Sequence, residues 1–216
     1  MSLTPLLREN LRLLIRSSRK TDFTPYHMIR ALYLLSVEGP LGRGLISKYL
    51  GLGEGSTRNL MRKLRDLGLI EIDLVAGGFL TERGEELVRE WSSIIVSKCI
   101  ERTDLVSWRY VAIHRISKQA ERTILREYTR NILLLRDELV KRGCCGALIM
   151  RIVEGEPRLL NSRGEPEYSI KSTELGSRIT ELCDDLCIAT GSDNSCVEAE
   201  ACIWNLLVEV ILQREV

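Results

Sequence analysis

Four amphipathic stretches dominate the N-terminal part of the chain. In each of them apolar residues recur three or four positions apart, the spacing that places side chains on one face of a helix. Polar or glycine-containing segments separate the stretches, and Thr24 with Pro25 suits the start of a helix. The pattern predicts helices at residues 4–17, 25–38, 43–50 and 56–67.

A short hairpin and a fifth helix follow. Residues 69–74 alternate apolar and acidic side chains and predict a strand, residues 76–78 predict a tight turn, and residues 79–80 begin a returning strand. Thr81 is a suitable cap for a helix at residues 81–98, because the acidic residues of its first turn complement the helix dipole.

The second half of the chain predicts a sheet covered by helices. The patterns indicate a strand at 105–116, a long helix at 118–141, strands around turns at 154–157 and 162–166, a helix from Thr173, a short strand at 187–190 and a last helix at 197–214. The order β-α-β-β-α-β-α is typical of a two-layer α/β sandwich of the split-βαβ type. We therefore expect an α+β protein of two domains, residues 1–98 and 99–216.

The composition is typical of a soluble globular protein. The chain has 216 residues, of which 44% are hydrophobic and 28% are charged. No apolar run approaches the roughly 18 residues of a membrane span, and the start of the sequence lacks the pattern of a signal peptide. We expect a cytoplasmic protein with no membrane partner. The many charged residues and the two glutamines favour a thermophilic source.

Charge is unevenly distributed although the net charge is +1. Residues 1–65 contain 12 Lys and Arg against 4 Asp and Glu, a balance of +8, whereas residues 99–216 contain 16 against 19, a balance of −3. A basic first part and a mildly acidic second part indicate two roles in one chain, of which the first is contact with a polyanion.

The predicted helix 56–67 concentrates this positive charge. Its apolar residues share one face and its arginines the other. Ser56 can cap the helix by accepting a hydrogen bond from the N–H of Asn59, and Gly68 suits its end. A basic face is also typical of an ordinary solvated helix. The basic excess of residues 1–65, the glycine-bounded turn before the helix and the hairpin after it favour a binding surface.

Residues 25–98 resemble the winged helix-turn-helix domains of bacterial and archaeal transcription regulators. The resemblance is carried by LISKYLGLGEGSTRNLMRKLRDLGLIEI and FLTERGEELV. It implies that helix 56–67 enters the major groove of double-stranded DNA while helix 43–50 braces it across the backbone. The whole layout is also similar to a little-characterised archaeal-type family that pairs a winged helix with an α+β C-terminal domain, but this likeness implies no site residues.

The resemblance implies a set of DNA contacts. Residues at and near the start of helix 56–67 would approach base edges, where an arginine can bind guanine through two hydrogen bonds, and Arg43 and Lys63 would lie closer to phosphates. The candidate DNA-binding residues are Arg43, Ser56, Thr57, Arg58, Asn59, Arg62 and Lys63. The turn at residues 76–78 has no Lys or Arg, so we expect the hairpin to be structural or to reach the minor-groove rim through its backbone.

The second half contains no recognisable catalytic set. The seven cysteines form no C-x-x-C pair and only two histidines are present, so we expect no metal and no cofactor and interpret the cysteines as small buried hydrophobes. A disulfide among the last four cysteines stays open, because hyperthermophile cytosols permit them. The best candidate for the rim of a small-molecule pocket is the polar turn of Ser192, Asp193, Asn194 and Ser195.

These patterns together predict a DNA-binding transcription regulator, not an enzyme, with an effector-sensing or dimerising C-terminal domain. A homodimer is expected because one short recognition helix makes few contacts and a two-fold axis suits palindromic half-sites. Its candidate surfaces are the helices at 4–17, 81–98 and 118–141. The expected partners are double-stranded DNA and a small-molecule effector. The alternatives are a protein- or RNA-interaction module built on a winged helix, and a small enzyme with an accessory winged helix.

Overall fold

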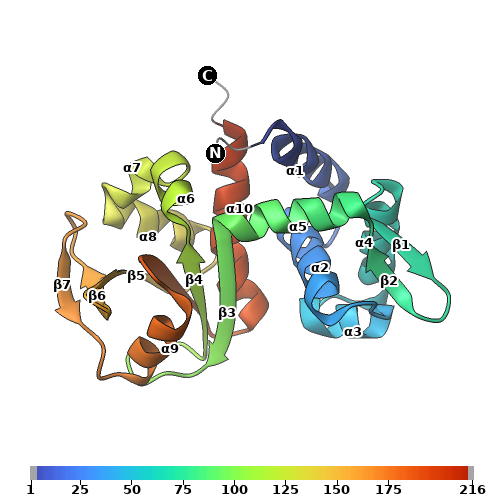
Figure 1. Cartoon of the computed structure of the whole chain (residues 1–216). Helices are drawn as coiled ribbons and strands as arrows, with labels where there is room; N and C mark the ends of the chain where they lie inside the picture. Colours follow the sequence, from blue (N-terminus) through green and yellow to red (C-terminus); the bar gives the residue numbers. More distant parts are fainter. Residues whose placement is uncertain (1–3, 214–216) are drawn as a thin grey trace. The chain divides into compact units, whose positions relative to one another are not determined.

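The computed structural model describes residues 4–213 and divides the chain into two compact units of mixed α and β structure (Figure 1). The division falls between Ser92 and Ser93, earlier than the predicted boundary at residues 98 and 99. Each unit has its own sheet, of two strands in the first and six in the second. Within the described residues, no helix combines the length and apolarity that crossing a membrane requires.

The N-terminal unit follows the predicted order of elements. It contains α1 (Pro5–Ser18), α2 (Pro25–Glu38), α3 (Arg43–Leu50), α4 (Glu54–Asp66), β1 (Ile70–Asp73), β2 (Gly77–Leu80) and α5 (Glu82–Ile94). Thr4 caps α1 by accepting the N–H of Leu7 at 3.1 Å, and Thr81 caps α5 by accepting the N–H of Gly84 at 3.1 Å. The apolar faces of the helices meet in a core whose leucines, among them Leu11, are fully buried.

The β1–β2 hairpin packs closely on the segment that precedes α3. The two strands are antiparallel, with Asp73 opposite Gly77. The N–H of Leu41 donates to the carbonyl of Gly78 at 3.0 Å, and the N–H of Gly78 donates back at 2.9 Å. Gly77 has a φ of +93°, and a Cβ there would stand 2.4 Å from the carbonyl oxygen of Leu41. This position therefore requires glycine.

The C-terminal unit is a six-stranded sheet with helices around it. It contains β3 (Ile95–Glu101), β4 (Tyr110–Ile116), α6 (Lys118–Thr123), α7 (Arg126–Thr129), α8 (Ile132–Lys141), β5 (Gly146–Val153), β6 (Glu156–Leu160), β7 (Pro166–Ser169), α9 (Glu174–Leu182), β8 (Leu186–Ser192) and α10 (Cys196–Gln213). The strand order is β3-β4-β8-β5-β6-β7, and every neighbouring pair is antiparallel.

Two predicted helices were wrong in extent. The helix predicted at 81–98 ends at Ile94, and β3 follows at once because residues 95–97 alternate buried and half-buried side chains and pair with β4. The helix predicted at 118–141 is divided into α6, α7 and α8. Asn131 begins α8 by accepting the N–H of Leu134 at 3.1 Å, and such a cap competes with a continuous helix.

The predicted two-layer sandwich was also wrong, because helices cover both faces of the sheet (Figure 1). On one face, Leu175 and Ile179 of α9 pack against Val111 and Ile113 of β4. On the other face, α10 contacts β3, β4 and β8. The physical reason is the central strand β8, where all seven residues are buried and a layer of helix is needed on each side.

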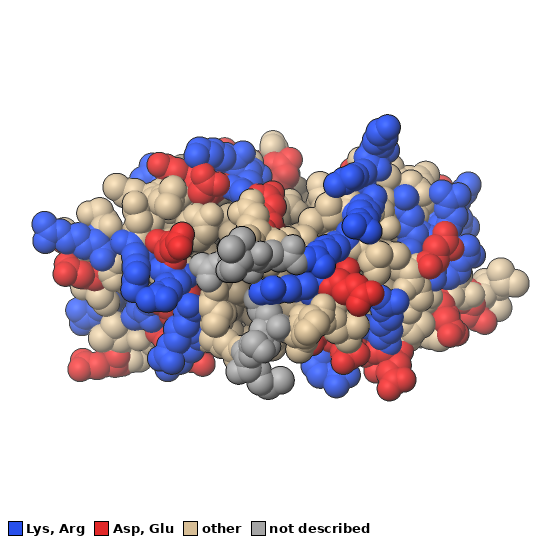
Figure 2. Space-filling model, turned by 90° about the horizontal axis from the view of Figure 1, so that it is seen from above, with Lys and Arg blue, Asp and Glu red and all other residues tan. Residues whose placement is uncertain are grey.

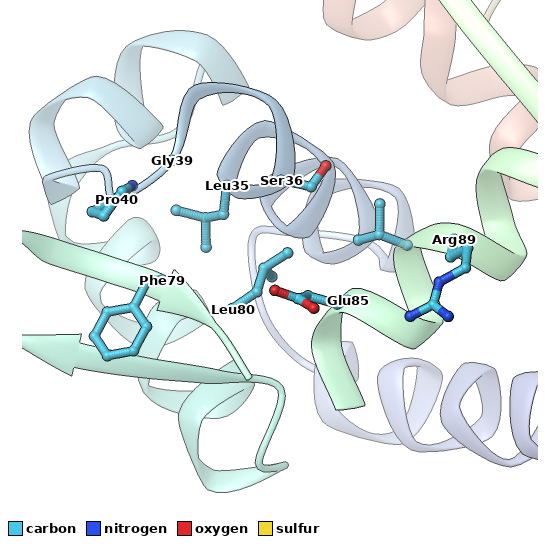
Figure 3. Close-up of a pocket in the computed structure, with 9 residues that line it drawn as sticks. Leu35, Ser36, Gly39, Pro40, Phe79, Leu80, Glu85 and Arg89 are labelled. Carbon is cyan, nitrogen blue, oxygen red and sulfur yellow. The ribbon is translucent and has the colours of Figure 1, made fainter. Parts of the chain in front are cut away.

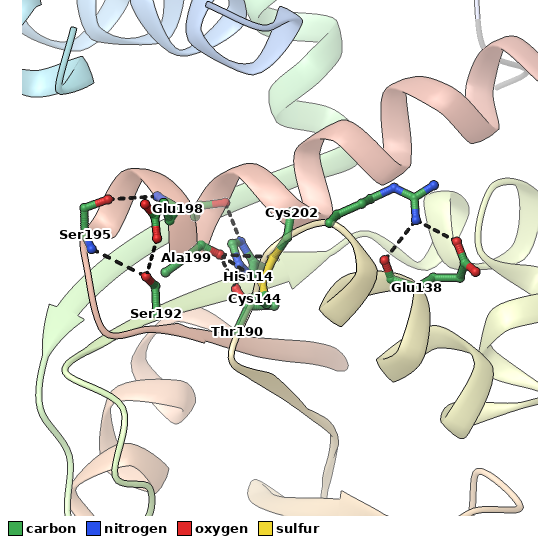
Figure 4. Close-up of a disulfide and its surroundings, with 11 residues drawn as sticks. His114, Glu138, Cys144, Thr190, Ser192, Ser195, Glu198, Ala199 and Cys202 are labelled. Atoms are coloured by element: carbon green, nitrogen blue, oxygen red, sulfur yellow. Dashed lines mark hydrogen bonds and ion pairs between the residues drawn. A yellow bond between two sulfur atoms is a disulfide. The ribbon is translucent and has the colours of Figure 1, made fainter.

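A chain of buried polar groups connects α10 to the sheet, and Figure 4 shows its His114, Thr190 and Ala199 part. The Trp204 indole N–H donates to Ser97 Oγ at 2.9 Å, and Ser97 lies 2.7 Å from His114 Nδ1. His114 Nε2 lies 2.7 Å from Thr190 Oγ1, which donates to the carbonyl of Ala199. Because the Thr190 hydroxyl donates its proton to the carbonyl of Ala199, it can only accept from His114. His114 Nε2 is therefore protonated and donates to Thr190 Oγ1. His114 is thus a structural strand residue with both ring nitrogens hydrogen-bonded.

Six of the seven cysteines form disulfides, all within the C-terminal unit. Cys99–Cys196 attaches α10 to β3, and Cys144–Cys202 attaches it to the loop before β5. Cys183–Cys187 joins the end of α9 to β8. Cys145 is the free cysteine and is exposed. The interpretation of the cysteines as small buried hydrophobes did not foresee these three pairs, but the disulfide among the last four cysteines that the sequence left open is present as Cys183–Cys187. The other two pairs join residues far apart in the sequence, which only the tertiary fold brings together.

The packing of Trp108 on two glycines makes a testable prediction. Gly146 and Gly191 face each other across β5 and β8, and a Cβ at Gly191 would stand 2.0 Å from Trp108 Cδ2. Gly191→Ala is expected to lower the free energy of unfolding by about 1–3 kcal/mol, the usual cost of overpacking. Urea denaturation measures it. Gly44→Ala is the control, because its Cβ would meet nothing within 4 Å, and should leave stability unchanged or raise it by up to about 1 kcal/mol.

The disulfides predict the number of free thiols. Protein purified without reductant, then denatured and alkylated, should gain the mass of one label, and peptide mapping should place it on Cys145. Cys145→Ser should gain none. Labelling of further cysteines before reduction would contradict the three pairings.

Candidate nucleic-acid interface

The outer face of α4 presents two arginines to solvent. Leu60, Met61 and Leu64 are buried on the inner face, so Arg58 and Arg62, four residues apart, point outward and are exposed. Arg62 Nη2 donates to Asn59 Oδ1 at 2.9 Å, a bond that restrains the guanidinium without neutralising it. The predicted exposure of this face is confirmed.

No carboxylate of residues 4–213 forms an ion pair with these arginines, nor with Arg43 or Lys63. Arg43 is exposed at the first position of α3, and Lys63 is half-buried in the last turn of α4. Arg65 differs, because it pairs with Asp66 at 3.0 Å. Four of the predicted cations therefore remain available to an anionic partner.

The start of α4 differs from the prediction. The helix begins at Glu54 after Gly53, so Ser56 lies inside the first turn and is not the cap; its hydroxyl donates to Asp22 Oδ2 at 2.7 Å. Thr57 is completely buried and its hydroxyl donates to the carbonyl of Gly53 at 3.1 Å. Ser56 is thus engaged by the protein, and Thr57 cannot reach a base. The sequence did not reveal this, because glycine can begin a helix through its backbone alone.

Acidic residues lie beside the cations. Asp22 and Glu54 are both exposed near the start of α4, where they reduce the attraction of the helix N-terminus for a phosphate. Figure 2 looks onto the side of the molecule that carries α1 and shows Lys and Arg side chains with Asp and Glu side chains among them. The basic excess of residues 1–65 is thus distributed over a surface of mixed charge.

The hairpin tip carries no cation, as the sequence indicates. Its outermost residues are Leu74 and Val75, and the exposed carboxylates of Glu71 and Asp73 lie on β1 behind them. The tip therefore lacks cationic side chains that bind phosphate.

The predicted ligand turn of the C-terminal unit bonds mainly to the protein itself (Figure 4). Ser192 is buried and donates to Glu198 Oε2 at 2.9 Å, and Asn194 Nδ2 donates to the same oxygen at 2.8 Å. Ser195 Oγ caps α10 by accepting the N–H of Glu198 at 3.1 Å, and Asp193 accepts the N–H of Arg109 at 3.1 Å. These bonds account for the polar residues of the turn, and a ligand role for them stays a prediction.

A pocket that the sequence did not indicate lies in the N-terminal unit (Figure 3). Leu35, Phe79, Leu80 and Val88 line it, with Arg89 among the polar lining residues, and its volume is about 480 Å³. Its walls come from α2, β2 and α5, which meet only in the folded chain, so no local pattern marks it.

Comparison with known proteins finds two likenesses. Residues 27–86 match the model of the PH0730-like N-terminal domain. The whole chain is similar in structure to the hypothetical protein PH0730 from Pyrococcus horikoshii OT3, with a TM-score of 0.60 and 24% sequence identity over 90% of this chain and 95% of that chain. A search of curated proteins finds no match. The likeness supports a two-unit α+β fold similar to that of an archaeal protein and carries no function.

Proposed function

We propose that the N-terminal unit is a winged helix-turn-helix that binds double-stranded DNA, and that the chain is a transcription regulator. In this proposal α4 is the recognition helix, α3 braces it and the β1–β2 hairpin is the wing. The observation that carries the proposal is the outer face of α4, where Arg58 and Arg62 are exposed, one helical turn apart and without a carboxylate partner among residues 4–213.

The side chains divide into two roles. Arg58 and Arg62 have the reach and the donor geometry to read base edges, with Asn59 orienting Arg62. Arg43 and Lys63 neutralise phosphates, which releases counterions and makes affinity depend on salt. Thr57 takes no part, because its side chain is buried.

The C-terminal unit would sense an effector or hold two copies together. β4 and β5 are joined through α6–α8 and both run antiparallel to β8, which lies between them. This arrangement supports the split-βαβ type, which does not by itself define a ligand. A cytoplasmic location, a small-molecule effector and a homodimer on a palindromic site complete the proposal.

A second candidate is a module that binds protein instead of DNA. It is favoured by the exposed carboxylates of Asp22, Glu54, Glu71 and Asp73, which lie on the same unit as the arginines. A polyanion would be repelled by each of them, whereas a protein partner of mixed charge would not.

The arginines of α4 make the first test. Fluorescence anisotropy with labelled duplex, selected from a random pool, should show log affinity falling with log salt at a slope of about −0.9 per phosphate contacted. Arg58→Ala and Arg62→Ala should each cost about 1–3 kcal/mol on the selected duplex and less on random duplex. Arg163→Ala, an exposed arginine of the C-terminal unit, is the matched control and should change neither. Absence of salt-dependent binding to any duplex would refute the proposal.

A substitution at Asp22 should change DNA affinity in the opposite direction, and this is the second test. Asp22→Asn removes one negative charge beside α4 and keeps an oxygen that can accept the Ser56 hydroxyl. DNA affinity should rise about fivefold at low salt, the effect of roughly 1 kcal/mol of removed repulsion, and the gain should shrink at high salt. Asp184→Asn, an exposed carboxylate of the C-terminal unit, is the control. An unchanged affinity in Asp22→Asn would place the DNA away from the start of α4.

A further inference from the structure

The tip of the β1–β2 hairpin consists of two large apolar side chains in full contact with solvent. Leu74 and Val75 expose 101% and 97% of their reference areas, and Ile72 on the adjoining strand is also exposed. Adjacent apolar side chains that nothing covers indicate contact with a partner.

This tip is held in a defined conformation. Asp73 Oδ1 accepts the N–H groups of Val75 and Ala76, each at 2.7 Å. The hydrogen bond from Ala76, and next that from Val75, lowers the pKa of Asp73, so its carboxylate stays charged. An ordered turn loses little conformational freedom on binding, which favours its use as a contact.

DNA is a poor binding partner for this tip. The exposed carboxylates of Glu71 and Asp73 lie next to it, and residues 70–80 contain no Lys or Arg. Inserting Leu74 and Val75 between bases would bring these carboxylates towards phosphates. The chemistry that fits the tip is an apolar surface with cations at its margin.

Helix α3 of the same chain has this chemistry. Leu45 and Tyr49 are 51% and 48% exposed and lie four residues apart, hence on one face of the helix. Arg43 and Lys48 are exposed on the same helix, and no carboxylate of residues 4–213 forms an ion pair with either. The α3 surface and the hairpin tip are thus complementary in both apolarity and charge.

The two surfaces are neighbours in one molecule. Leu41, two residues before α3, exchanges two backbone hydrogen bonds with Gly78 of β2. A two-fold symmetric interface uses the same patch on both copies, so a patch that contains both complementary parts can bind itself.

We propose that this patch joins two copies of the chain, with the hairpin tip of each copy on α3 of the other. Leu74 and Val75 pack against Leu45 and Tyr49, and the carboxylates of the hairpin lie near the cations of α3. The pairing does not require DNA and does not rest on the proposed DNA binding. Because Arg43 also belongs to the proposed DNA-binding face, a pair formed in this way is the DNA-free form, and an operator-bound dimer uses a different surface.

Sedimentation of the full chain without DNA, from about 1 μM to about 1 mM, tests the pairing. Leu74→Asp and Leu45→Asp should each weaken self-association between about tenfold and a hundredfold, because each removes one leucine contact at both of the symmetry-related sites. Leu133→Asp is the matched control, since Leu133 lies on α8 with the same 51% exposure as Leu45, and it should change nothing. Circular dichroism should give the wild-type melting temperature for each variant, so that lost association is not lost folding.

A charge exchange tests the orientation of the two copies. Glu71→Lys should weaken the pair, and the combination of Glu71→Lys with Lys48→Glu should restore it. The proposal is overturned if the wild-type chain is a monomer throughout the range, or if Leu133→Asp dissociates it while Leu74→Asp and Leu45→Asp do not. Both outcomes are measured without DNA, whereas the duplex titrations measure DNA binding itself, so failure here is distinct from failure of the proposed DNA binding.

Discussion

The N-terminal unit depends on the close approach of β2 to Leu41 on one side and to Met61 of α4 on the other. A Cβ at Gly77 would stand 2.4 Å from the Leu41 carbonyl oxygen, and a Cβ at Gly78 would stand 2.7 Å from Met61 Cε. Gly77 meets backbone and has a positive φ, so only glycine fits there, whereas a side chain at Gly78 would have to displace the flexible end of Met61. This packing holds the hairpin against α4 and beside α3, and the helical spacing of α4 leaves Arg58 and Arg62 on its outer face. The proposed pairing surface follows from the packing, and the proposed DNA surface follows from the helical spacing.

The C-terminal unit is stabilised by a different means, a long apolar helix fastened to the sheet by directional bonds. Trp204, Ser97, His114 and Thr190 form a hydrogen-bonded chain in which each donor meets an acceptor, so burying these groups costs little. Two disulfides cross-link the same helix, and Cys99–Cys196 has a sequence separation of 97. A link of that span stabilises by roughly 3–5 kcal/mol when unfolded-chain entropy dominates. Hyperthermophilic archaea and bacteria keep disulfides inside the cell, so the three pairs are compatible with the thermophilic source expected from the sequence.

The positions of the charged residues in the folded N-terminal unit indicate more about function than the net charge of its sequence does. The balance of +8 in residues 1–65 favours a polyanion, but the folded unit sets Asp22 and Glu54 beside α4 and sets Glu71 and Asp73 on the hairpin. Few cations of α4 are therefore available. The proposed DNA binding rests more on Arg58 and Arg62 than on the basic excess of residues 1–65. The same mixture of charges is what allows the chain to be complementary to itself.

The sequence by itself determined the helices of the N-terminal unit, the hairpin after α4 and the outward face of Arg58 and Arg62, because helical spacing and turn residues are local properties. It could not locate the true start of α4, the burial of Thr57 or the partner of Ser56, since a glycine cap and a contact with Asp22 leave no periodic signal. Strand β3, the division of residues 118–141 and the helices on both faces of the sheet were decided by strand pairing. The disulfides and the apolar pocket also depend on the tertiary structure, because residues such as Cys99 and Cys196 become neighbours only when the chain is folded.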